Sequence, residues 1–370
     1  MHYCFITGLY SRTDGLMFIR QGRSLVKAGY RVTYIVCDDQ PDEVRDGIEI
    51  LSTRFRPKGR LDRFLNTKKI LFKLAKEEDA DIYQISDPEL IGLVKDFKKI
   101  GKKVVFNLRE FYPDIIAKKP YFSQFVSKLI AWSYDKVLKL RLKEYDAVFT
   151  VTDWILDEVR NRYNVGHSYL LTNFPIIDRS FNLLYEDYLK RGDVLCYEGT
   201  IYSNSRQENV FKALEQVPKI KYLMAGKIEE KYEWIKKLPY WINVEFIDGF
   251  KIDDLPGIFG RSTISNVFRD FEGRDGSFGV MKVFESMEAG LPVLFADVPL
   301  YKSINVKYQC GICVDPNNVD SVRNAIQYMV EHKHEAYEMG QRGRMAIEQE
   351  YNWDTQAELF IKVINDILKE

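Results

Sequence analysis

Short apolar runs alternate with amphipathic stretches through the first half of the chain. Short apolar runs are typical of buried strands, whereas apolar positions three and four residues apart are typical of helices. Residues 18–36 contain both, as an amphipathic helix, a stop at Gly29 and a strand. This alternation predicts a parallel sheet with helices on both faces. Strands are expected at residues 3–8, 30–36, 81–86, 103–107 and 147–152.

The same alternation returns after a polar stretch rich in Asp, Arg and Tyr, residues 176–192, which we interpret as a linker. We therefore expect an α/β protein with two Rossmann-like, doubly wound domains whose strand ends face a cleft. The predicted parts are an N-terminal domain (1–175), a C-terminal domain (193–352) and a final helix (353–370) that returns towards the N-terminal domain. Strands of the second domain are expected at 193–199, 221–226, 243–249, 262–268, 292–297 and 311–315.

Residues 280–297 predict a short helix followed by a buried strand. Gly290 stands just beyond the expected helix end, and Pro292 prevents the helix from continuing. Glycines before the helix leave backbone N–H groups available to an anion, which the helix dipole also attracts. Lys282 and Glu285 are three residues apart and project from one face. A cation beside a carboxylate suits a diphosphate and ribose hydroxyls, so the segment indicates a nucleotide-sugar site. The alternative is an ordinary crossover helix with surface charges.

Composition narrows the class of protein. The length of 370 residues allows two cores, and a hydrophobic fraction of 46% with 29% charged residues is typical of a soluble globular protein. The five cysteines are scattered and odd in number, which favours a reducing cytoplasm. Cys310 and Cys313 form a CxxC pair without a second cluster at metal-ligand spacing. Asp38 and Asp39 are interpreted as a strand-end turn. We expect no metal and no cofactor.

The start of the chain and its hydropathy predict a cytoplasmic protein. A strand begins directly, without a basic leader, and no apolar run is long enough to span a membrane. The net charge of zero hides an asymmetry. Residues 1–180 hold 31 Lys and Arg against 24 Asp and Glu (+7), which leaves 23 against 30 (−7) for the remainder. The two halves are therefore expected to meet different partners.

Residues 120–145 form a basic amphipathic segment, in which one helical face carries Phe122, Phe125, Val126, Leu129 and Ile130. Such a helix can lie on an anionic membrane surface, here the inner membrane. The alternative is a helix packed on the core with a solvated charged face. Nucleic acid is not an expected partner, because no reading module accompanies the basic groups. From 118 to 143 the chain has one acid, Asp135, and seven basic residues, which are Lys118, Lys119, Lys128, Lys136, Lys139, Arg141 and Lys143. The segment 58–64 (KGRLDRF) adds to the basic character of the domain.

Several segments resemble bacterial glycosyltransferases of the two-domain GT-B architecture, in the GT4-like group. Residues 18–36 are similar to the first helix–strand unit of that group, 87–114 to its second signature, and 282–294 to its nucleotide-sugar signature. The ending from Met339 to Trp353 is similar to the family's C-terminal helices. The resemblance implies transfer of a sugar from a nucleoside-diphosphate sugar, UDP-linked. The implied acceptor is a polyprenyl-diphosphate-linked oligosaccharide or polysaccharide precursor in exopolysaccharide, O-antigen or capsule synthesis.

The resemblance also implies a donor site, residue by residue. Glu285 corresponds to the family glutamate that bonds the ribose hydroxyls, and Lys282 stands where related enzymes place a lysine near the diphosphate. Gly249 and Phe250 fall where the backbone usually meets the nucleobase. Thr200 belongs to the loop that commonly approaches the phosphates, and Lys227 would supply a second cation. For both residues the alternative is an ordinary role in a turn. The other donor-site candidates are Gly199, Gly226, Ser277, Gly279, Met281 and Glu272.

The sequence departs from the family pattern at two points. Many retaining members carry two glutamates spaced E-x7-E, but Ser277 takes the first position here, so Glu272 or Asp275 would fill that role or it is absent. Related enzymes have Asp-x-His-Glu where this chain has residues 107–110 (NLRE). Arg109 cannot be a base, because a guanidinium stays protonated. None of the four histidines is placed for catalysis.

A carboxylate base is needed if the enzyme inverts the anomeric centre. The run Gly-Val-Met-Lys at 279–282 resembles xanthan-type glucuronosyltransferases, which are inverting. Glu110 follows a predicted strand end and is the first candidate. Its alternative is a structural carboxylate paired with Arg109 or a helix N-terminus, and the stereochemistry stays open. The other candidates for the base are Asp14, Asp87 and Asp114.

The implied mechanism is metal-independent. Lys282, with Lys227 and the N–H groups at the helix start, would stabilise the charge of the departing diphosphate. A lysine there is also compatible with UDP-glucuronate. Two alternatives stay open, a nucleotide-sugar 2-epimerase of the same fold and a catalytically degenerate nucleotide-binding scaffold. A dinucleotide oxidoreductase is disfavoured, because residues 6–15 lack G-x-G-x-x-G.

Overall fold

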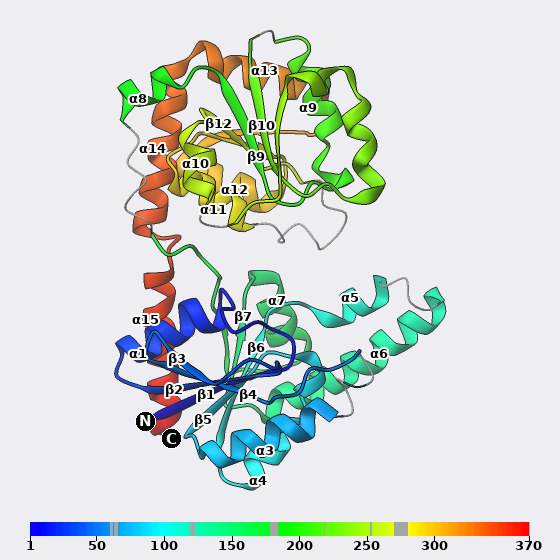
Figure 1. Cartoon of the computed structure of the whole chain (residues 1–370), viewed down its shortest axis with the longest axis vertical. Coiled ribbons are helices and arrows are strands. Elements are labelled where there is room, and N and C mark those ends of the chain that lie inside the picture. Colours follow the sequence, from blue (N-terminus) through cyan, green and yellow to red (C-terminus); the bar gives the residue numbers. More distant parts are fainter. Residues whose placement is uncertain are drawn as a thin grey trace. The chain divides into compact units, whose positions relative to one another are not determined.

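The chain divides into two compact units (Figure 1). The computed structural model describes residues 1–59, 62, 66–118, 123–177, 184–217, 219–251, 254–269 and 280–369. Unit 1 comprises Met1–Asn173 and Trp353–Glu370, and unit 2 comprises Phe174–Asn352. Each unit contains a sheet of its own, which confirms the predicted α/β fold with two parallel sheets.

Unit 1 is built on an eight-stranded sheet in the order β3-β4-β2-β1-β5-β6-β7-β8. Neighbouring strands are parallel except for the antiparallel pair β3–β4 at one edge. In β1, Cys4 and Ile6 join the core on one face, whereas Tyr3 and Phe5 join the core on the other. Because both faces are covered, the central strands are mostly apolar, and their few polar side chains, such as Thr33 and Gln84, are buried as well. The strands are β1 (His2–Thr7), β2 (Arg31–Val36), β3 (Glu43–Arg45), β4 (Ile48–Ser52), β5 (Ile82–Ile85), β6 (Lys103–Leu108), β7 (Ala147–Thr150) and β8 (Ser168–Leu170).

Helices cover both faces of this sheet. One face carries α3 (Lys68–Glu78), α4 (Leu93–Lys99), α5 (Tyr112–Lys118), α6 (Gln124–Arg141) and α7 (Asp153–Asp157). The other face carries the π-helical turn η1 (Met17–Gly22), α1 (Arg23–Lys27) and the final helix α15 (Trp353–Lys369). Phe360 of α15 makes edge-to-face ring contacts with Tyr3 and Phe149 of the sheet. The end of the chain therefore completes the core of unit 1. Short turns are η3 (Pro88–Leu90), η4 (Leu142–Glu144) and η5 (Glu158–Arg162).

Unit 2 is built on a six-stranded, fully parallel sheet in the order β11-β10-β9-β12-β13-β14. From β9 the chain adds β10 and β11 on one side and then β12 to β14 on the other, so the winding reverses between β9 and β12. The strands are β9 (Val194–Glu198), β10 (Lys221–Gly226), β11 (Val244–Asp248), β12 (Ile264–Asn266), β13 (Val293–Ala296) and β14 (Gly311–Val314).

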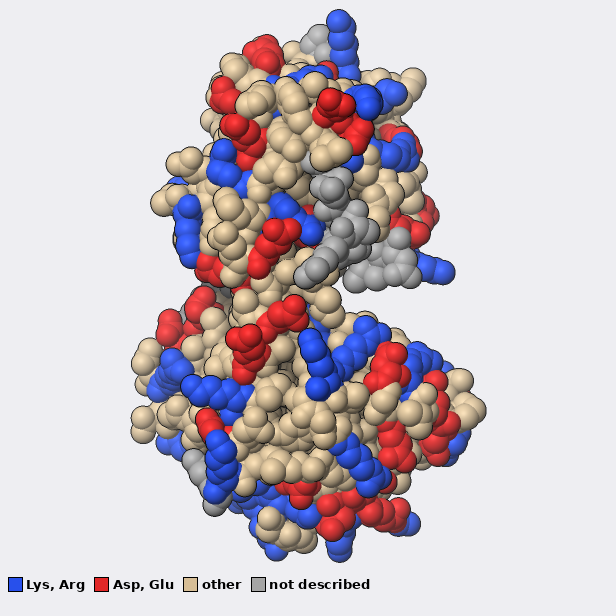
Figure 2. Space-filling model, turned by 90° about the vertical axis from the view of Figure 1, so that its left-hand side faces the viewer, with Lys and Arg blue, Asp and Glu red and all other residues tan. Residues whose placement is uncertain are grey.

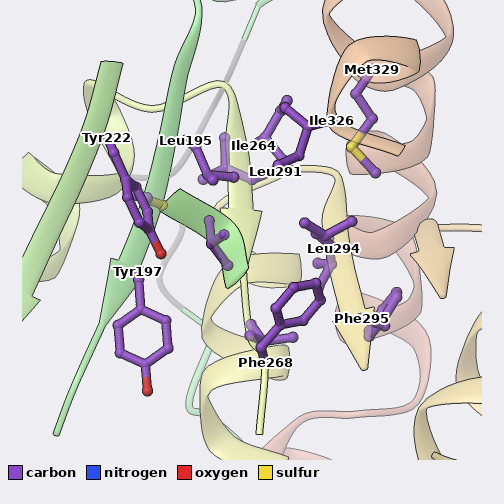
Figure 3. Packing of buried hydrophobic residues seen from close by; sticks show 14 of the residues in the cluster. Leu195, Tyr197, Tyr222, Ile264, Phe268, Leu291, Leu294, Phe295, Ile326 and Met329 are labelled. Carbon is purple, nitrogen blue, oxygen red and sulfur yellow. The ribbon is translucent and has the colours of Figure 1, made fainter. Parts of the chain in front are cut away.

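The core of unit 2 fills the space between this sheet and its helices. Figure 3 shows Leu195, Ile264 and Leu294 of the sheet with Ile326 and Met329 of α13. The predicted helix stop is confirmed, since α11 ends at Glu288 and Gly290 has a φ of +71°. The helices are α8 (Tyr185–Lys190), α9 (Gln207–Leu214), α10 (Leu255–Gly260), α11 (Val280–Glu288), α12 (Pro299–Tyr308), α13 (Val319–Glu331) and α14 (Lys333–Gln349), with short turns η6 (Ser203–Ser205), η7 (Glu230–Lys237) and η8 (Pro239–Asn243).

Residues 176–192, predicted as a linker, fall in unit 2 and contain helix α8. Tyr188 of α8 is fully buried, and its hydroxyl donates to the carbonyl oxygen of Thr263 over 3.1 Å. This part of the segment is therefore attached to the sheet of unit 2. On the face that Figure 2 shows, acidic and basic side chains are intermixed in both units, so the charge asymmetry of the sequence does not appear there as patches of one sign.

Candidate functional site

A pocket in unit 2 lies at the carboxyl ends of β9 and β12. The sheet reverses its winding between these two strands, and in doubly wound sheets ligands bind at such a switch point. The pocket has a volume of about 240 Å³. The described residues that line it are Tyr197, Thr200, Tyr202, Asn204, Val267, Phe268, Arg269, Lys282 and Tyr301.

Lys282, in the first turn of α11, is the best-placed cation of this pocket. Its Nζ atom donates to the hydroxyl of Tyr197 over 3.1 Å and lies 4.2 Å from the centre of that ring. Figure 3 shows the Tyr197 hydroxyl pointing away from the labelled core residues. None of the described acidic residues forms a direct ion pair with Lys282. The ammonium group is therefore oriented by an aromatic hydroxyl and is available to an anion.

Two glycines bring the loops of this pocket close to each other. A Cβ atom added to Gly199 would lie 2.6 Å from both Cε and Nζ of Lys282. A Cβ atom added to Gly226 would lie 1.9 Å from the carbonyl oxygen of Gly199. Both glycines also have positive φ values, +97° and +142°. The side chain of Lys282 can thus cross the end of β9 only because glycines occupy positions 199 and 226.

The lining also contains polar groups that the sequence analysis missed. Arg269 follows β12, and its guanidinium carbon lies 5.8 Å from the ring centre of Tyr202. The amide oxygen of Asn204 is buried and has no hydrogen-bond partner among the described residues. A ligand with donor groups would satisfy this oxygen. The only local signal was the position of Arg269 directly after the predicted strand 262–268.

The other predicted donor residues have varied positions. Thr200 lines the pocket, whereas Lys227 is exposed and is not among the described lining residues. Gly249 has a φ of +75° in the turn after β11, and Phe250 packs partly buried against the core. Met281 and Glu285 are half-buried on α11. Ser277, Gly279, Glu272 and Asp275 lie outside the described residues.

In unit 1, Asp14 is part of a charge cluster at the carboxyl ends of the central strands. Its carboxylate accepts from the backbone N–H groups of Leu16 and Met17 over 3.1 and 2.8 Å. The same carboxylate forms an ion pair with Arg109 at 3.0 Å. The guanidinium of Arg109 also stacks on Tyr10, 4.1 Å from the ring centre. Asp14 therefore fixes the start of η1 and compensates a largely buried arginine.

Asp87 and Glu110, two further predicted bases, differ in their surroundings. Asp87 is buried, and its two oxygens accept from the Thr7 hydroxyl over 2.8 Å and the Gly8 N–H over 2.6 Å. Glu110 is exposed just beyond β6, and no described residue bonds to its carboxylate. Asp114 lies in the first turn of α5. Of Asp14, Asp87 and Glu110, only Glu110 is thus free to meet a substrate hydroxyl.

A second pocket, of about 680 Å³, lies at the ends of β1 and β2 in unit 1. Arg12 joins its loops: it donates to Asp38 over 2.8 Å and to the carbonyl oxygens of Gln40 and Pro41 over 2.9 and 2.7 Å. Burial opposes the ionisation of Asp38, but hydrogen bonds from Arg12 and Ser52 lower the pKa of its carboxyl. The Asp38 turn is therefore a loop anchor. Within the described ranges, no three His, Cys, Asp or Glu side chains cluster as metal ligands would.

Helix α6 presents an unusual surface in unit 1. It is buried through Ser127, Ala131, Asp135 and Leu138. Asp135, its one acid, accepts from Arg162 over 2.7 Å and from the hydroxyl of Tyr163. On the opposite face the exposed apolar side chains are Phe125 (79%), Val126 (37%), Leu129 (52%), Ile130 (39%), Trp132 (60%), Val137 (42%) and Leu140 (65%). Of the five residues predicted to share one face, Phe125, Val126, Leu129 and Ile130 do so, and that face points to solvent, whereas Phe122 lies outside the described residues. In the part of the chain that is described, no helix is both long and apolar enough to cross a bilayer.

Two family models match this chain, one in each half. Residues 17–171 match the family model described as Glycosyltransferase Family 4, and residues 188–346 match the model described as Glycosyl transferases group 1. Among curated proteins, no sequence match is found.

Solved structures of similar fold cover the whole chain. Sucrose-phosphate synthase from Thermosynechococcus elongatus has a TM-score of 0.75 at 15% identity, over 100% of this chain and 99% of its own. Anabaena HepE in complex with UDP has a TM-score of 0.69 at 12% identity, over 99% of both chains. WaaG, a glycosyltransferase involved in lipopolysaccharide biosynthesis, has a TM-score of 0.70 at 13% identity, over 98% of this chain and 99% of its own. At such identities the likeness concerns the fold.

Proposed function

We propose a donor and an acceptor for this chain, which belongs to the GT4-like glycosyltransferases of the GT-B fold (EC 2.4). The reaction of such an enzyme moves a sugar from a nucleotide sugar. The proposed donor is a UDP-sugar, and the proposed acceptor is a lipid-linked or polysaccharide precursor of a bacterial surface glycan. The observation that carries the proposal is Lys282, held by Tyr197 in a pocket at the switch point of unit 2.

The diphosphate of the donor is placed at Lys282. The departing nucleoside diphosphate gains negative charge in the transition state, and a preorganised ammonium group stabilises that charge. The N-terminal N–H groups of α11, which have no partner within the helix, add to the same field. In this proposal the lysine and the backbone take the role that a metal ion has in other enzymes. Arg269 supplies the second cation, in place of Lys227.

The choice of UDP is supported by proteins of the same fold. HepE was solved with UDP and with UDP-glucose, and another neighbour, from E. coli, with UDP-2-fluoro glucose. Gly249 and Phe250 follow β11, next to β10, where the proposal places the nucleobase. Glu285, half-buried on the same helix as Lys282, is proposed to accept hydrogen bonds from the ribose. The sugar itself stays open, and UDP-glucuronate is one candidate.

The acceptor is assigned to unit 1. Its pocket of about 680 Å³ at the ends of β1 and β2 offers the room. Glu110 is proposed as the base that takes the proton of the attacking hydroxyl, because its carboxylate is exposed and Asp14 and Asp87 already bind other groups. This assignment corresponds to inversion at the anomeric carbon.

Helix α6 is proposed to hold the enzyme at an anionic membrane surface. Its exposed face combines large apolar side chains with Lys128 and Lys136, and its one acid, Asp135, is buried. Anionic lipids attract a lysine by about 1 kcal/mol, and the apolar side chains insert at the headgroup boundary. A lipid-linked acceptor lies at the same surface. The location of the helix on unit 1 therefore agrees with the assignment of the acceptor to that unit.

The first test is calorimetric titration of the purified chain with UDP, GDP, ADP and CDP, without and with Mg²⁺. We expect saturable binding of UDP that does not depend on Mg²⁺. If a nucleoside diphosphate with a different base binds instead, that nucleotide replaces UDP in the proposed donor. Binding of UDP only in the presence of Mg²⁺ would contradict the role given to Lys282. No binding of any of the four would favour a scaffold. Donor turnover without an acceptor would instead indicate a 2-epimerase.

A further inference from the structure

Glu198 lies in the chain between Tyr197 and Thr200, which line the donor pocket, without being itself among the described lining residues. Glu198 is the last residue of β9, directly before Gly199, and it is only 5% exposed. Its Oε1 atom is buried and has no hydrogen-bond partner among the residues that the structure describes. An unpartnered carboxylate in a buried place costs free energy, so a nearby positive charge is needed to compensate it.

Lys282 is the charged group that acts on this carboxyl. The ammonium group passes over Gly199, one residue after Glu198, and donates to the hydroxyl of Tyr197. The lysine and the glutamate therefore attract each other through space, without a direct ion pair. Burial raises the pKa of the Glu198 carboxyl, and Lys282 opposes that shift. Among the described residues, the thiol of Cys196 also interacts electrostatically with Glu198, and burial raises the pKa of that thiol to about 12, so it stays neutral.

We propose that Glu198 is the counter-charge of Lys282 in the free enzyme and takes up a proton when the donor diphosphate binds. This inference rests on the proposed function, because it needs a diphosphate at Lys282. The phosphate oxygens bring negative charge to the ammonium group, which then no longer compensates the carboxylate. One carboxylate oxygen of Glu198 accepts a proton from solvent and becomes a neutral acid. No other bond forms or breaks.

A pH dependence of donor affinity follows from this proton uptake. Since the complex holds one proton more than the free enzyme, affinity falls as the pH rises above the pKa of Glu198 in the free enzyme. A glutamine has the shape of the neutral acid. The variant Glu198→Gln should therefore bind the donor with an affinity that does not change with pH, and more tightly than the natural chain at high pH.

The test measures proton uptake directly. UDP-glucose is titrated into the full chain in two buffers of different ionisation enthalpy, and the difference between the observed enthalpies gives the number of protons taken up. The second phosphate ionisation, near pH 6 in monoesters, is absent from a diphosphate esterified at both ends, so the ligand adds no proton of its own. A matched control is Glu288→Gln, which alters an equally buried glutamate at the far end of α11.

The expected result is uptake of up to one proton by the natural chain and by Glu288→Gln, and none by Glu198→Gln. Equal uptake by all three would overturn the role of Glu198 while leaving the donor site in place. Absence of uptake by the natural chain would overturn it without any variant. If the natural chain binds neither UDP nor UDP-glucose, both the donor site and this inference fail. A merely structural role of Glu198 would change affinity equally at every pH.

Discussion

The two units place charged side chains at the same position, the carboxyl ends of parallel strands, but use them differently. In unit 1, Asp14 pairs with Arg109, and Arg12 pairs with Asp38. In unit 2, Lys282 has a tyrosine hydroxyl as its partner, and it acts on the carboxyl of Glu198 without a direct ion pair. The first arrangement holds loops, and the second leaves a cation ready for an anion. A charged side chain at the end of a strand is therefore evidence for a binding site only when no opposite charge already pairs with it.

Glu110 is the exception in unit 1, and its removal should have the largest effect. Glu110→Gln is expected to lower the transfer rate roughly 10²- to 10⁴-fold, the usual range for loss of a general base, with little change in UDP affinity. The measurement is the initial rate with saturating UDP-sugar and acceptor. Asp114→Asn, in the first turn of the following helix, is the control and should lose much less. Normal transfer by Glu110→Gln would exclude the base role and favour a retaining mechanism.

The next effect tests the pairing of charges in unit 1. Asp14→Asn leaves the guanidinium of Arg109 largely buried without its counter-charge, so we expect a loss of about 3 kcal/mol in the free energy of unfolding of unit 1. Urea denaturation followed by fluorescence measures it. The control is Asp46→Asn, which alters an exposed pair with Arg23, 41% and 49% exposed, and should change stability by less than about 0.5 kcal/mol. Equal effects would show that the Arg109 pair is not special.

The corresponding change in unit 2 should affect binding more than stability. Lys282→Ala is expected to weaken UDP binding by about 1.5–3 kcal/mol, the scale of a charge-assisted hydrogen bond. Its free energy of unfolding should change much less than that of Asp14→Asn, because Glu198, which Lys282 compensates without a direct ion pair, can take up a proton when the lysine is removed. Calorimetric titration gives the affinity, with Lys227→Ala as the control cation outside the described pocket lining. Unchanged affinity in Lys282→Ala would remove this residue from the donor site.

The smallest effect concerns the outer face of α6. Trp132→Ser removes a side chain that is 60% exposed, and it should weaken binding to vesicles containing anionic lipid by about 1–2 kcal/mol. Co-sedimentation with phosphatidylcholine and phosphatidylglycerol vesicles measures the change. Ile242→Ser, an 88% exposed apolar residue in unit 2, is the matched control. Equal losses in both variants, or no binding by the natural chain, would contradict a membrane face on α6.

From the sequence we predicted the central strands of both sheets, several helices, the stop at Gly290 and the position of Lys282 at a helix start, but not the strands β3, β4 and β8 near the edges of the first sheet. These features depend on hydropathy period and backbone geometry within a few residues, which a sequence displays directly. The apolar stripe of α6 was likewise visible. The sequence did not show which side of α6 is buried. That side is set by Asp135 and its partners Arg162 and Tyr163, which are 27 and 28 residues away.

The tertiary structure alone decided which strand-end residues are partners. Asp14 and Arg109 are 95 residues apart, and they meet because Asp14 follows β1 and Arg109 follows β6, two parallel strands whose carboxyl ends lie on the same side of the sheet. Arg269 and Asn204 enter one pocket because β9 and β12 are neighbours despite the strands between them in the chain. Strand order is a global property, since it reflects which pairing buries all apolar faces at once. Local patterns locate the side chains that carry chemistry, but only that order decides which of them act together.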